Sequence, residues 1–343
     1  MIAYRPIFRA LGLALALAWS PASSAATGSE LPLPREGWAS WQIPAATDVP
    51  AWCCFGDRRS GMPAIPQTCQ LDGRDHGYGN GERRETTTEM RIYARFHDGK
   101  LERVRALAAS CPVATDTVIQ ELGNVSVDAS AGWLAGVIAN DATKGARARR
   151  LDMDAMAALA THRGAGARDA LSAIARNDAD IEHRKDALFW LTQVRGAEGA
   201  AVVTPFMFDD ADARVREHAA FAVAQSRAVP TASLLIRQAS EDRNAQVRSR
   251  AWFWLAQTGA GETETAIRAA LKREADAGVR EQAVFALSRL PTERAVRALV
   301  AVAEDQSLSR NERKQAIFWL GEQKSDFALQ YLDRLLTAKT ADR

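Results

Sequence analysis

The alternation of apolar and polar positions repeats about every 32 residues through the last 200 positions of the chain. An alanine recurs at one position of this repeat, and a large apolar residue follows it four positions later in every copy. The alanines are Ala155, Ala187, Ala219, Ala251, Ala283 and Ala316, and their partners are Leu159, Leu191, Val223, Leu255, Leu287 and Leu320. Positions i and i+4 share one face of an α-helix, so each pair predicts a helix with a buried stripe. A fixed period of this length predicts a stack of similar units, an α-solenoid.

Each copy of the repeat is predicted to contain two helices. Seven residues before the alanine stands a residue suited to cap the second helix: Asp180, Asp212, Asn244, Asp276 or Ser309. A second apolar column predicts the first helices, with Leu171, Val203, Leu235, Ile267, Val300 and Leu332 as its members. The expected return turns contain Gly196, Pro230, Gly261 and Pro291. Pro205 is expected to kink the helix that contains it. This pattern predicts about six pairs and a closing helix near residues 326–337.

Several second helices are predicted to begin with a valine–arginine pair that precedes the repeat alanine. Examples are Val215-Arg216 to Ala219, Val247-Arg248 to Ala251 and Val279-Arg280 to Ala283. Over about residues 130–338 the pattern resembles HEAT-like repeats of the phycobilisome-lyase type. The resemblance implies scaffold or adaptor roles, and no residue set of a lyase is present. It also implies that the arginines brace neighbouring turns against the cap residues; these are Arg184, Arg216, Arg248, Arg280 and Arg313. The first copy departs from the pattern, with Asp152 at the arginine position and Ala148 at the cap position.

Residues 27–125 show no helical periodicity, and we expect a small β-rich N-terminal domain there, followed by the solenoid over 126–343. Residues 89–97 alternate as a strand does, and Asp98-Gly99 is typical of a tight turn into a second strand over 101–109. The glycine-dense segment 72–82 fits neither an EF-hand nor a phosphate-binding loop, so we expect a surface loop.

Four cysteines, Cys53, Cys54, Cys69 and Cys111, all precede the repeats. An even count in an exported chain predicts two disulfides. A bond between the adjacent Cys53 and Cys54 would be strained, so one is expected to pair with Cys69 and the other with Cys111, in an order left open. The alternative is a redox or metal-binding vicinal pair, although the spacing matches neither a Cys-x-x-Cys motif nor a zinc knuckle.

The first 26 residues have the order of a secretory signal peptide. Arg5 and Arg9 precede an apolar run over 11–19 that is too short to span a bilayer, and the small residues 22–26 follow. We expect cleavage after Ala25 or Ala26 and a periplasmic or secreted protein; the alternative is an uncleaved anchor. No later stretch is long enough for a transmembrane segment. The net charge of +2, without a basic block, argues against nucleic acid as the partner.

A phenylalanine recurs two positions after the repeat alanine, on the face that the helical wheel predicts to be solvent-exposed and concave. The column is Phe189, Phe221, Phe253, Phe285 and Phe318, and the first copy has Ala157 instead. The next position alternates between large and small residues: Trp190, Ala222, Trp254, Ala286 and Trp319. A contiguous stripe of large apolar residues is typical of an interaction surface, so these phenylalanines and tryptophans are the candidate partner-binding residues. Two alternatives stay open: the rings pack between copies of the repeat, or the N-terminal domain covers them.

No residue set in the sequence points to a reaction, and we expect no catalytic residue, no metal and no cofactor. Iron-dependent hydroxylases with HEAT-like repeats resemble this architecture, but they use repeated His-Glu pairs as metal ligands. The repeats here contain such a pair only in reversed order, Glu217-His218. No Gly-x-Ser-x-Gly motif is present, and the acidic pair Asp209-Asp210 is expected to be solvated.

The leading hypothesis is an exported scaffold or adaptor that binds a protein or peptide partner along the concave aromatic stripe. One alternative is an enzyme, or an accessory subunit of an enzyme, that uses the N-terminal domain. Another is a regulatory sensor of the cell envelope. The sequence leaves the partner, the oligomeric state and the biological process open.

Overall fold

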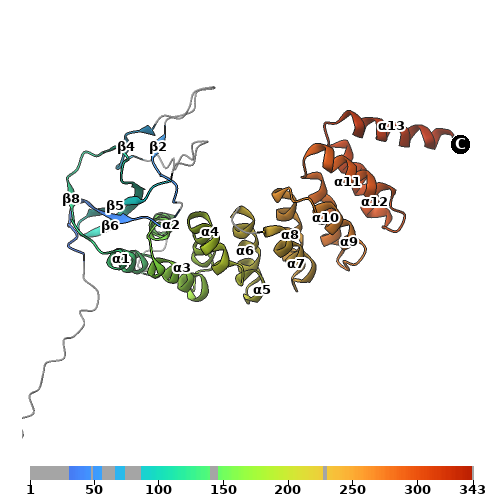
Figure 1. The fold of residues 1–343 in the computed structure, drawn as a ribbon. Helices are drawn as coiled ribbons and strands as arrows, with labels where there is room; N and C mark the ends of the chain where they lie inside the picture. Colours follow the sequence, from blue (N-terminus) through green and yellow to red (C-terminus); the bar gives the residue numbers. More distant parts are fainter. Residues whose placement is uncertain are drawn as a thin grey trace, which may run out of the picture.

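A computed structural model describes residues 31–47, 49–55, 66–73, 86–139, 146–226 and 230–341. The predicted signal peptide and most of the glycine-dense segment lie outside these residues. In the described part, a small β region precedes a long curved array of helices (Figure 1). The protein is therefore mostly helical, as the periodicity predicts.

The helices come in pairs up to the closing helix. The first pair is α1 (Val127–Ala139) with α2 (Ala146–Ala160), and α3 (Ala165–Asn177) pairs with the first half of α4 (Ile181–Val203). Non-helical backbone at Gly196 (φ 50°) divides α4 at the predicted turn. Its second half continues across the predicted kink at Pro205 into α5 (Phe206–Asp209), and together they pair with α6 (Ala213–Gln225).

The later pairs are regular. They are α7 (Thr231–Glu241) with α8 (Ala245–Thr258), α9 (Thr263–Leu271) with α10 (Ala277–Ser288), and α11 (Thr292–Glu304) with α12 (Arg310–Gly321). Helix α13 (Asp326–Ala341) closes the array. The six predicted pairs and the closing helix are thus confirmed within the described residues.

The predicted caps and core positions are confirmed residue by residue. Each of the five cap residues accepts a hydrogen bond from a backbone N–H in the first turn of its helix. All six repeat alanines and their i+4 partners are buried. Two members of the first-helix column were wrong: Leu299 and Tyr331 are buried, whereas the predicted Val300 and Leu332 are only partly buried. The buried positions of the first helices keep the 32-residue spacing from Ile267 to Leu299 and Tyr331, whereas the alanine column gains one residue between Ala283 and Ala316.

The β region is built on a four-stranded sheet with the order β6-β5-β1-β8. Its strands are β1 (Gly37–Pro44), β5 (Glu89–His97), β6 (Lys100–Ala108) and β8 (Ile119–Glu121). The predicted hairpin is confirmed as β5 and β6, and Asp98 (φ 51°) and Gly99 (φ 71°) both adopt the left-handed conformation that such a tight turn requires. Two short pairs, β2 (Cys54–Phe55) with β3 (Pro66–Gln67) and β4 (Cys69–Gln70) with β7 (Val113–Ala114), complete it.

The two faces of the sheet have different partners. One face, with Trp41, Ile43 and Ile92, belongs to the same hydrophobic core as Leu134 and Ile138 of α1. The opposite face carries a smaller cluster around Trp38, Leu71, Tyr93 and Leu107. This smaller cluster also contains cysteines of two disulfides, Cys53–Cys111 and Cys54–Cys69. The outward pairing of the adjacent cysteines is therefore confirmed, and the structure adds its order.

A buried chain of hydrogen bonds joins the sheet to the first helices. Trp41 Nε1 donates to Ser130 Oγ at 2.7 Å, and Ser130 Oγ lies 2.7 Å from His162 Nε2. His162 Nδ1 lies 2.9 Å from the carbonyl oxygen of Ala158, which can only accept, so Nδ1 carries the proton and Nε2 accepts from the serine. Burial lowers the pKa of His162 to about 4. The Ser130–His162 pair is closed to solvent, so its role is structural.

Among the described residues, none of the helices is both long enough and apolar enough to cross a bilayer.

Candidate protein-binding surface

The candidate aromatic residues lie on the second helices of the pairs. Phe189 and Trp190 are on α4, Phe221 on α6, Phe253 and Trp254 on α8, Phe285 on α10, and Phe318 and Trp319 on α12. Helices α4, α6 and α8 face the inner side of the curved array (Figure 1). Seven of the eight residues are partly buried, and Phe318 is 59% exposed. The column is therefore neither fully exposed nor enclosed between the pairs.

The aromatic rings contact each other from one pair to the next. Phe189 and Phe221 stack with ring centres 6.0 Å apart and planes 4° from parallel. Phe253 and Phe285 repeat this arrangement at 6.3 Å and 6°. Both stacks occur where the following position is a buried alanine, Ala222 or Ala286, so no indole separates the two phenylalanines.

The tryptophans join these stacks into one series. Trp254 lies 4.9 Å from Phe221 of the preceding pair and 4.9 Å from its neighbour Phe253. Trp319 lies 4.9 Å from Phe285 and 5.0 Å from Phe318 in the same way. The alternation of large and small residues thus produces a continuous row of rings, which we call the aromatic ladder: Trp52, Trp190, Phe189, Phe221, Trp254, Phe253, Phe285, Trp319 and Phe318.

The first ring of the ladder comes from the β region and was missed by the sequence analysis. Trp52 packs edge to face on Trp190, with ring centres 5.8 Å apart. The first copy of the repeat has Ala157 where the later copies have phenylalanine, and Trp52 takes the place of the missing ring. The absent phenylalanine was a signal that another element covers this position. Among the described residues, the N-terminal region meets the ladder through the ring contact of Trp52 with Trp190, at the start of the ladder.

Polar side chains flank the ladder. Arg250 of α8 pairs with Glu217 of α6 at 3.2 Å. The ring of His218 lies 5.2 Å from Phe221. Burial, followed by repulsion from Lys185, lowers the pKa of His218 to about 4, so this imidazole is neutral at pH 7. The ladder is therefore an apolar strip with polar borders of mixed charge.

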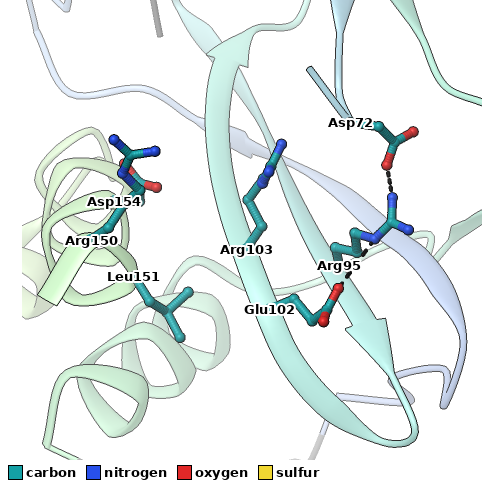
Figure 2. Close-up of a pocket in the computed structure, with 7 residues that line it drawn as sticks. All are labelled: Asp72, Arg95, Glu102, Arg103, Arg150, Leu151 and Asp154. Carbon is teal, nitrogen blue, oxygen red and sulfur yellow. Dashed lines mark ion pairs between the residues drawn. The ribbon is translucent and has the colours of Figure 1, made fainter. Parts of the chain in front are cut away.

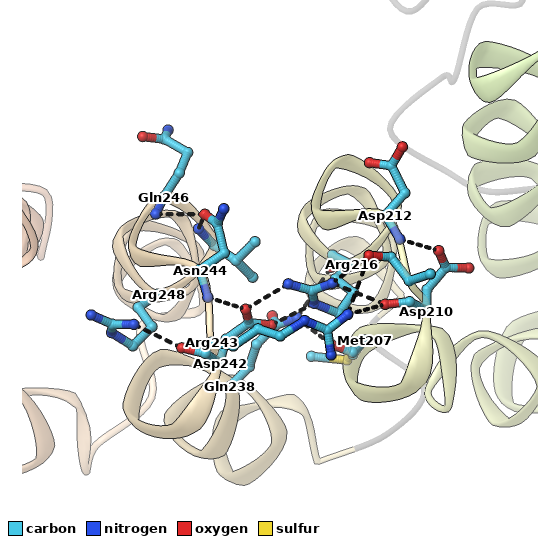
Figure 3. A network of polar contacts seen from close by, with 12 residues as sticks. Met207, Asp210, Asp212, Arg216, Gln238, Asp242, Arg243, Asn244, Gln246 and Arg248 are labelled. Atoms are coloured by element: carbon cyan, nitrogen blue, oxygen red, sulfur yellow. Dashed lines mark hydrogen bonds and ion pairs between the residues drawn. The ribbon is translucent and has the colours of Figure 1, made fainter.

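Four of the five repeat arginines brace adjacent pairs, as the resemblance implies, whereas Arg313 donates through Nη1 to the carbonyl oxygen of Leu308, just before its own helix. Arg216 donates through Nε and Nη2 to both oxygens of Asp242, at 2.8 and 2.9 Å, and through Nη1 to the carbonyl oxygen of Asp210 (Figure 3). Both charged side chains are almost fully buried, at 2% and 4% exposure. Arg248 donates to both oxygens of Glu274 in the same way, and Arg184 pairs with Asp210 through Nη2.

The acidic partners are different from the predicted ones. These arginines contact the acid two residues before each cap and not the cap itself, and that acid also accepts the cap's backbone N–H (Figure 3). Asp210 is one of these acids, so the expectation that it is solvated was wrong; its side chain is 8% exposed. Arg280 departs from the pattern and pairs at 2.8 Å with Glu312, a member of the capping box of α12.

The first copy replaces the arginine with Asp152. Asp152 and Asp178 then face the same space, and His183 lies between them, with its two ring nitrogens 3.3 Å from a carboxylate oxygen of each. The later copies have valine or glutamate at the position of His183. The histidine therefore occurs in the copy that follows the missing arginine of the first copy. The described residues contain no group of three or more histidine, cysteine, aspartate or glutamate side chains placed to hold a metal ion.

Comparison with known proteins agrees with the repeat analysis. The family model for HEAT repeats matches residues 168–251 and 232–312. No curated protein sequence matches the chain. A solved structure of human deoxyhypusine hydroxylase in complex with glycerol is similar at 16% identity, covering 61% of this chain and 90% of that one, with a TM-score of 0.25. A score this low carries no argument about function. From the repeat match and the paired helices, we conclude that residues 168–312 of the helical array are HEAT repeats.

Proposed function

We propose that the protein is an exported scaffold or adaptor that binds a protein or peptide partner along the aromatic ladder. The observation that carries this proposal is the continuous row of partly exposed rings on the second helices. HEAT repeats often mediate protein interactions, and an apolar strip with polar borders has the make-up of a protein interface.

The exposed parts of the rings favour a polypeptide as the partner. Stacking already occupies ring faces along the ladder, so the partner meets mainly ring edges. Aliphatic and aromatic side chains pack well on such edges, whereas a sugar needs a free ring face. The mixed charges on both borders provide hydrogen-bonding groups for a peptide backbone and its polar side chains.

Export is part of the same proposal. The charged, apolar and small residues at positions 1–26 support it, as do the two disulfides of the β region, which are typical of an oxidising compartment. Mass spectrometry of the mature protein from the cell envelope is expected to show an N-terminus immediately after Ala25 or Ala26.

Partner binding is tested with Phe318→Ser, because Phe318 is the most exposed ring of the ladder and its loss leaves the other stacks in place. The matched control is Phe327→Ser on α13, which removes a ring of similar exposure, 50%, outside the ladder. We expect affinity capture from the envelope to recover a protein with the unmodified chain and with the control. Recovery with Phe318→Ser should fall about tenfold, as for a hot-spot aromatic residue.

Two results would contradict the proposal. One is equal recovery of the same protein with all three chains, which would place the binding surface elsewhere. The other is that recovery of the protein falls with the control variant and is unchanged with Phe318→Ser. Circular dichroism of each variant checks that the helical array is intact.

A further inference from the structure

A charged cleft of about 620 Å³ opens between the sheet and α2 (Figure 2). Its walls are formed by Asp72, Arg95, Glu102 and Arg103 on the side of the β region and by Arg150, Leu151 and Asp154 on α2. The volume falls within the range of roughly 300–1,000 Å³ that is usual for small-molecule sites. None of these residues belongs to the aromatic ladder, so the cleft is independent of the proposed function.

Part of the charge on the β side is already paired. Arg95 forms ion pairs with Asp72 and, at 3.5 Å, with Glu102. Arg103 uses Nη1 to donate to the carbonyl oxygens of Leu71 and Gly73, at 3.0 and 2.7 Å. These bonds fix the guanidinium of Arg103, while its Nε and Nη2 donors make no hydrogen bond to another described residue. Burial, and then the neighbouring guanidinium groups of Arg95 and Arg150, lower the pKa of Arg103.

The α2 side carries two charges one helical turn apart. Arg150 and Asp154 occupy positions i and i+4, so both side chains lie on the face of α2 that borders the cleft (Figure 2). Neither forms an ion pair or hydrogen bond with another described residue. Burial raises the pKa of Asp154 to about 6, although the nearby guanidinium groups of Arg105, Arg150 and Arg103 act to lower it. This is expected of a buried carboxylate that accepts no hydrogen bond.

The cleft thus offers two guanidinium groups, a carboxylate and the apolar side chain of Leu151 to a ligand. A purely anionic ligand would meet the carboxylate of Asp154, and a purely cationic ligand would meet Arg103 and Arg150. We propose that the cleft binds a small zwitterion, an amino acid or short peptide with free termini. The ligand's carboxylate pairs with Arg103 and Arg150, its ammonium group donates to Asp154, and an aliphatic side chain contacts Leu151.

The proposal is tested by calorimetric titration of the purified protein with three dipeptides. Alanyl-leucine carries both charges, N-acetyl-alanyl-leucine lacks the ammonium group, and alanyl-leucinamide lacks the carboxylate. We expect the free dipeptide to bind about tenfold or more tightly than either blocked form, because each blocked form loses the charge-assisted hydrogen bonds of one terminus.

Two variants assign the charges to residues. Asp154→Asn is expected to remove the preference for the free over the acetylated dipeptide. Arg150→Gln is expected to reduce the preference for the acid over the amide, because Arg103 still pairs with the carboxylate. The matched controls are Asp169→Asn on α3 and Arg297→Gln on α11, whose side chains are 64% and 68% exposed and lie outside the cleft. Both controls should retain the two preferences.

Three results would overturn the inference. The first is no measurable binding of the free dipeptide. The second is equal binding of the free and blocked forms. The third is citrate binding as tightly as the dipeptide in both the unmodified protein and Asp154→Asn, which would define a simple anion site.

Discussion

At the residue scale, the main feature of the repeat is a buried arginine between two pairs of helices. Removing charges from water is costly, and the geometry offsets this cost only when every donor has a partner. Each of the three guanidinium nitrogens of Arg216 is bonded: Nε and Nη2 to Asp242, and Nη1 to backbone carbonyl oxygens of the turn before α6. The same side chain therefore anchors its own turn and the next pair, which keeps the stack in register.

Arg216→Met is expected to lower the free energy of unfolding by about 3–5 kcal/mol, because it leaves the carboxylate of Asp242 buried without its cation. The matched control is Arg214→Met in the same helix, since Arg214 pairs with Asp212 while 67% exposed. That change should cost at most about 1 kcal/mol. Urea titrations measure both values. Equal losses in the two variants would contradict a bracing role for the buried pair.

At the scale of the elements, the second helices are joined by their aromatic rings as well as by their buried alanines. The ladder depends on the alternation of tryptophan and alanine, because an indole fills the space between two phenylalanines in one interval and is absent in the next. Trp254 is the central link, since it contacts Phe221 of α6 and Phe253 of its own helix. The candidate binding surface and the packing of the pairs thus share the same residues.

Trp254→Ala is expected to lower the free energy of unfolding by about 2–4 kcal/mol, somewhat less than for a fully enclosed ring. It should also couple with Phe221→Ala: the double variant should lose about 1 kcal/mol less than the sum of the single variants, because the two rings contact each other. Urea titrations of the three variants give the coupling. Strict additivity would show that the ladder contact contributes nothing to stability.

At the scale of the whole molecule, the β region and the helical array are joined through one core. The sheet contributes Trp41 and Ile43 to the same cluster as α1, and the Trp41–Ser130–His162 chain crosses this junction. The chain needs a neutral imidazole, because Nε2 must accept the serine proton while Nδ1 donates to Ala158. Protonation of His162 would therefore break the hydrogen-bond chain at the junction.

The pH dependence of stability tests this junction. The pKa of His162 is about 4 in the folded protein and 6.5 in the reference state, so between these values the unfolded chain binds more protons. The free energy of unfolding should therefore fall as the pH is lowered through this window, and His162 should account for about 2 kcal/mol of the fall between pH 7 and pH 5.

The variant His162→Gln retains hydrogen-bonding groups and does not titrate. Its stability should fall by about 2 kcal/mol less than that of the unmodified protein over the same pH change. Other groups with shifted pKa values, His218 and Asp154 among them, are present in both chains, so the comparison isolates His162. Parallel pH profiles would contradict the assigned pKa.

The sequence by itself determined the helical array, because its signals are local. The i, i+4 pairs, the caps such as Asp212 and Ser309, and the breaks at Gly196 and Pro205 act within a few residues and repeat, so each copy reinforced the others. The hairpin turn at Asp98-Gly99 and the outward disulfide pairing followed from equally local geometry.

Only the tertiary structure decided how distant residues meet. The periodicity placed Phe221 and Phe253 on one face, but the tilt between neighbouring helices determines that rings stack and leave their edges exposed. Trp52 lies 138 positions before Trp190 in the chain, so no local pattern could place it at the start of the ladder. The cleft likewise joins two strands, a turn and a helix, and no local sequence pattern marks their charges, because a charge acquires a role only from the groups that surround it.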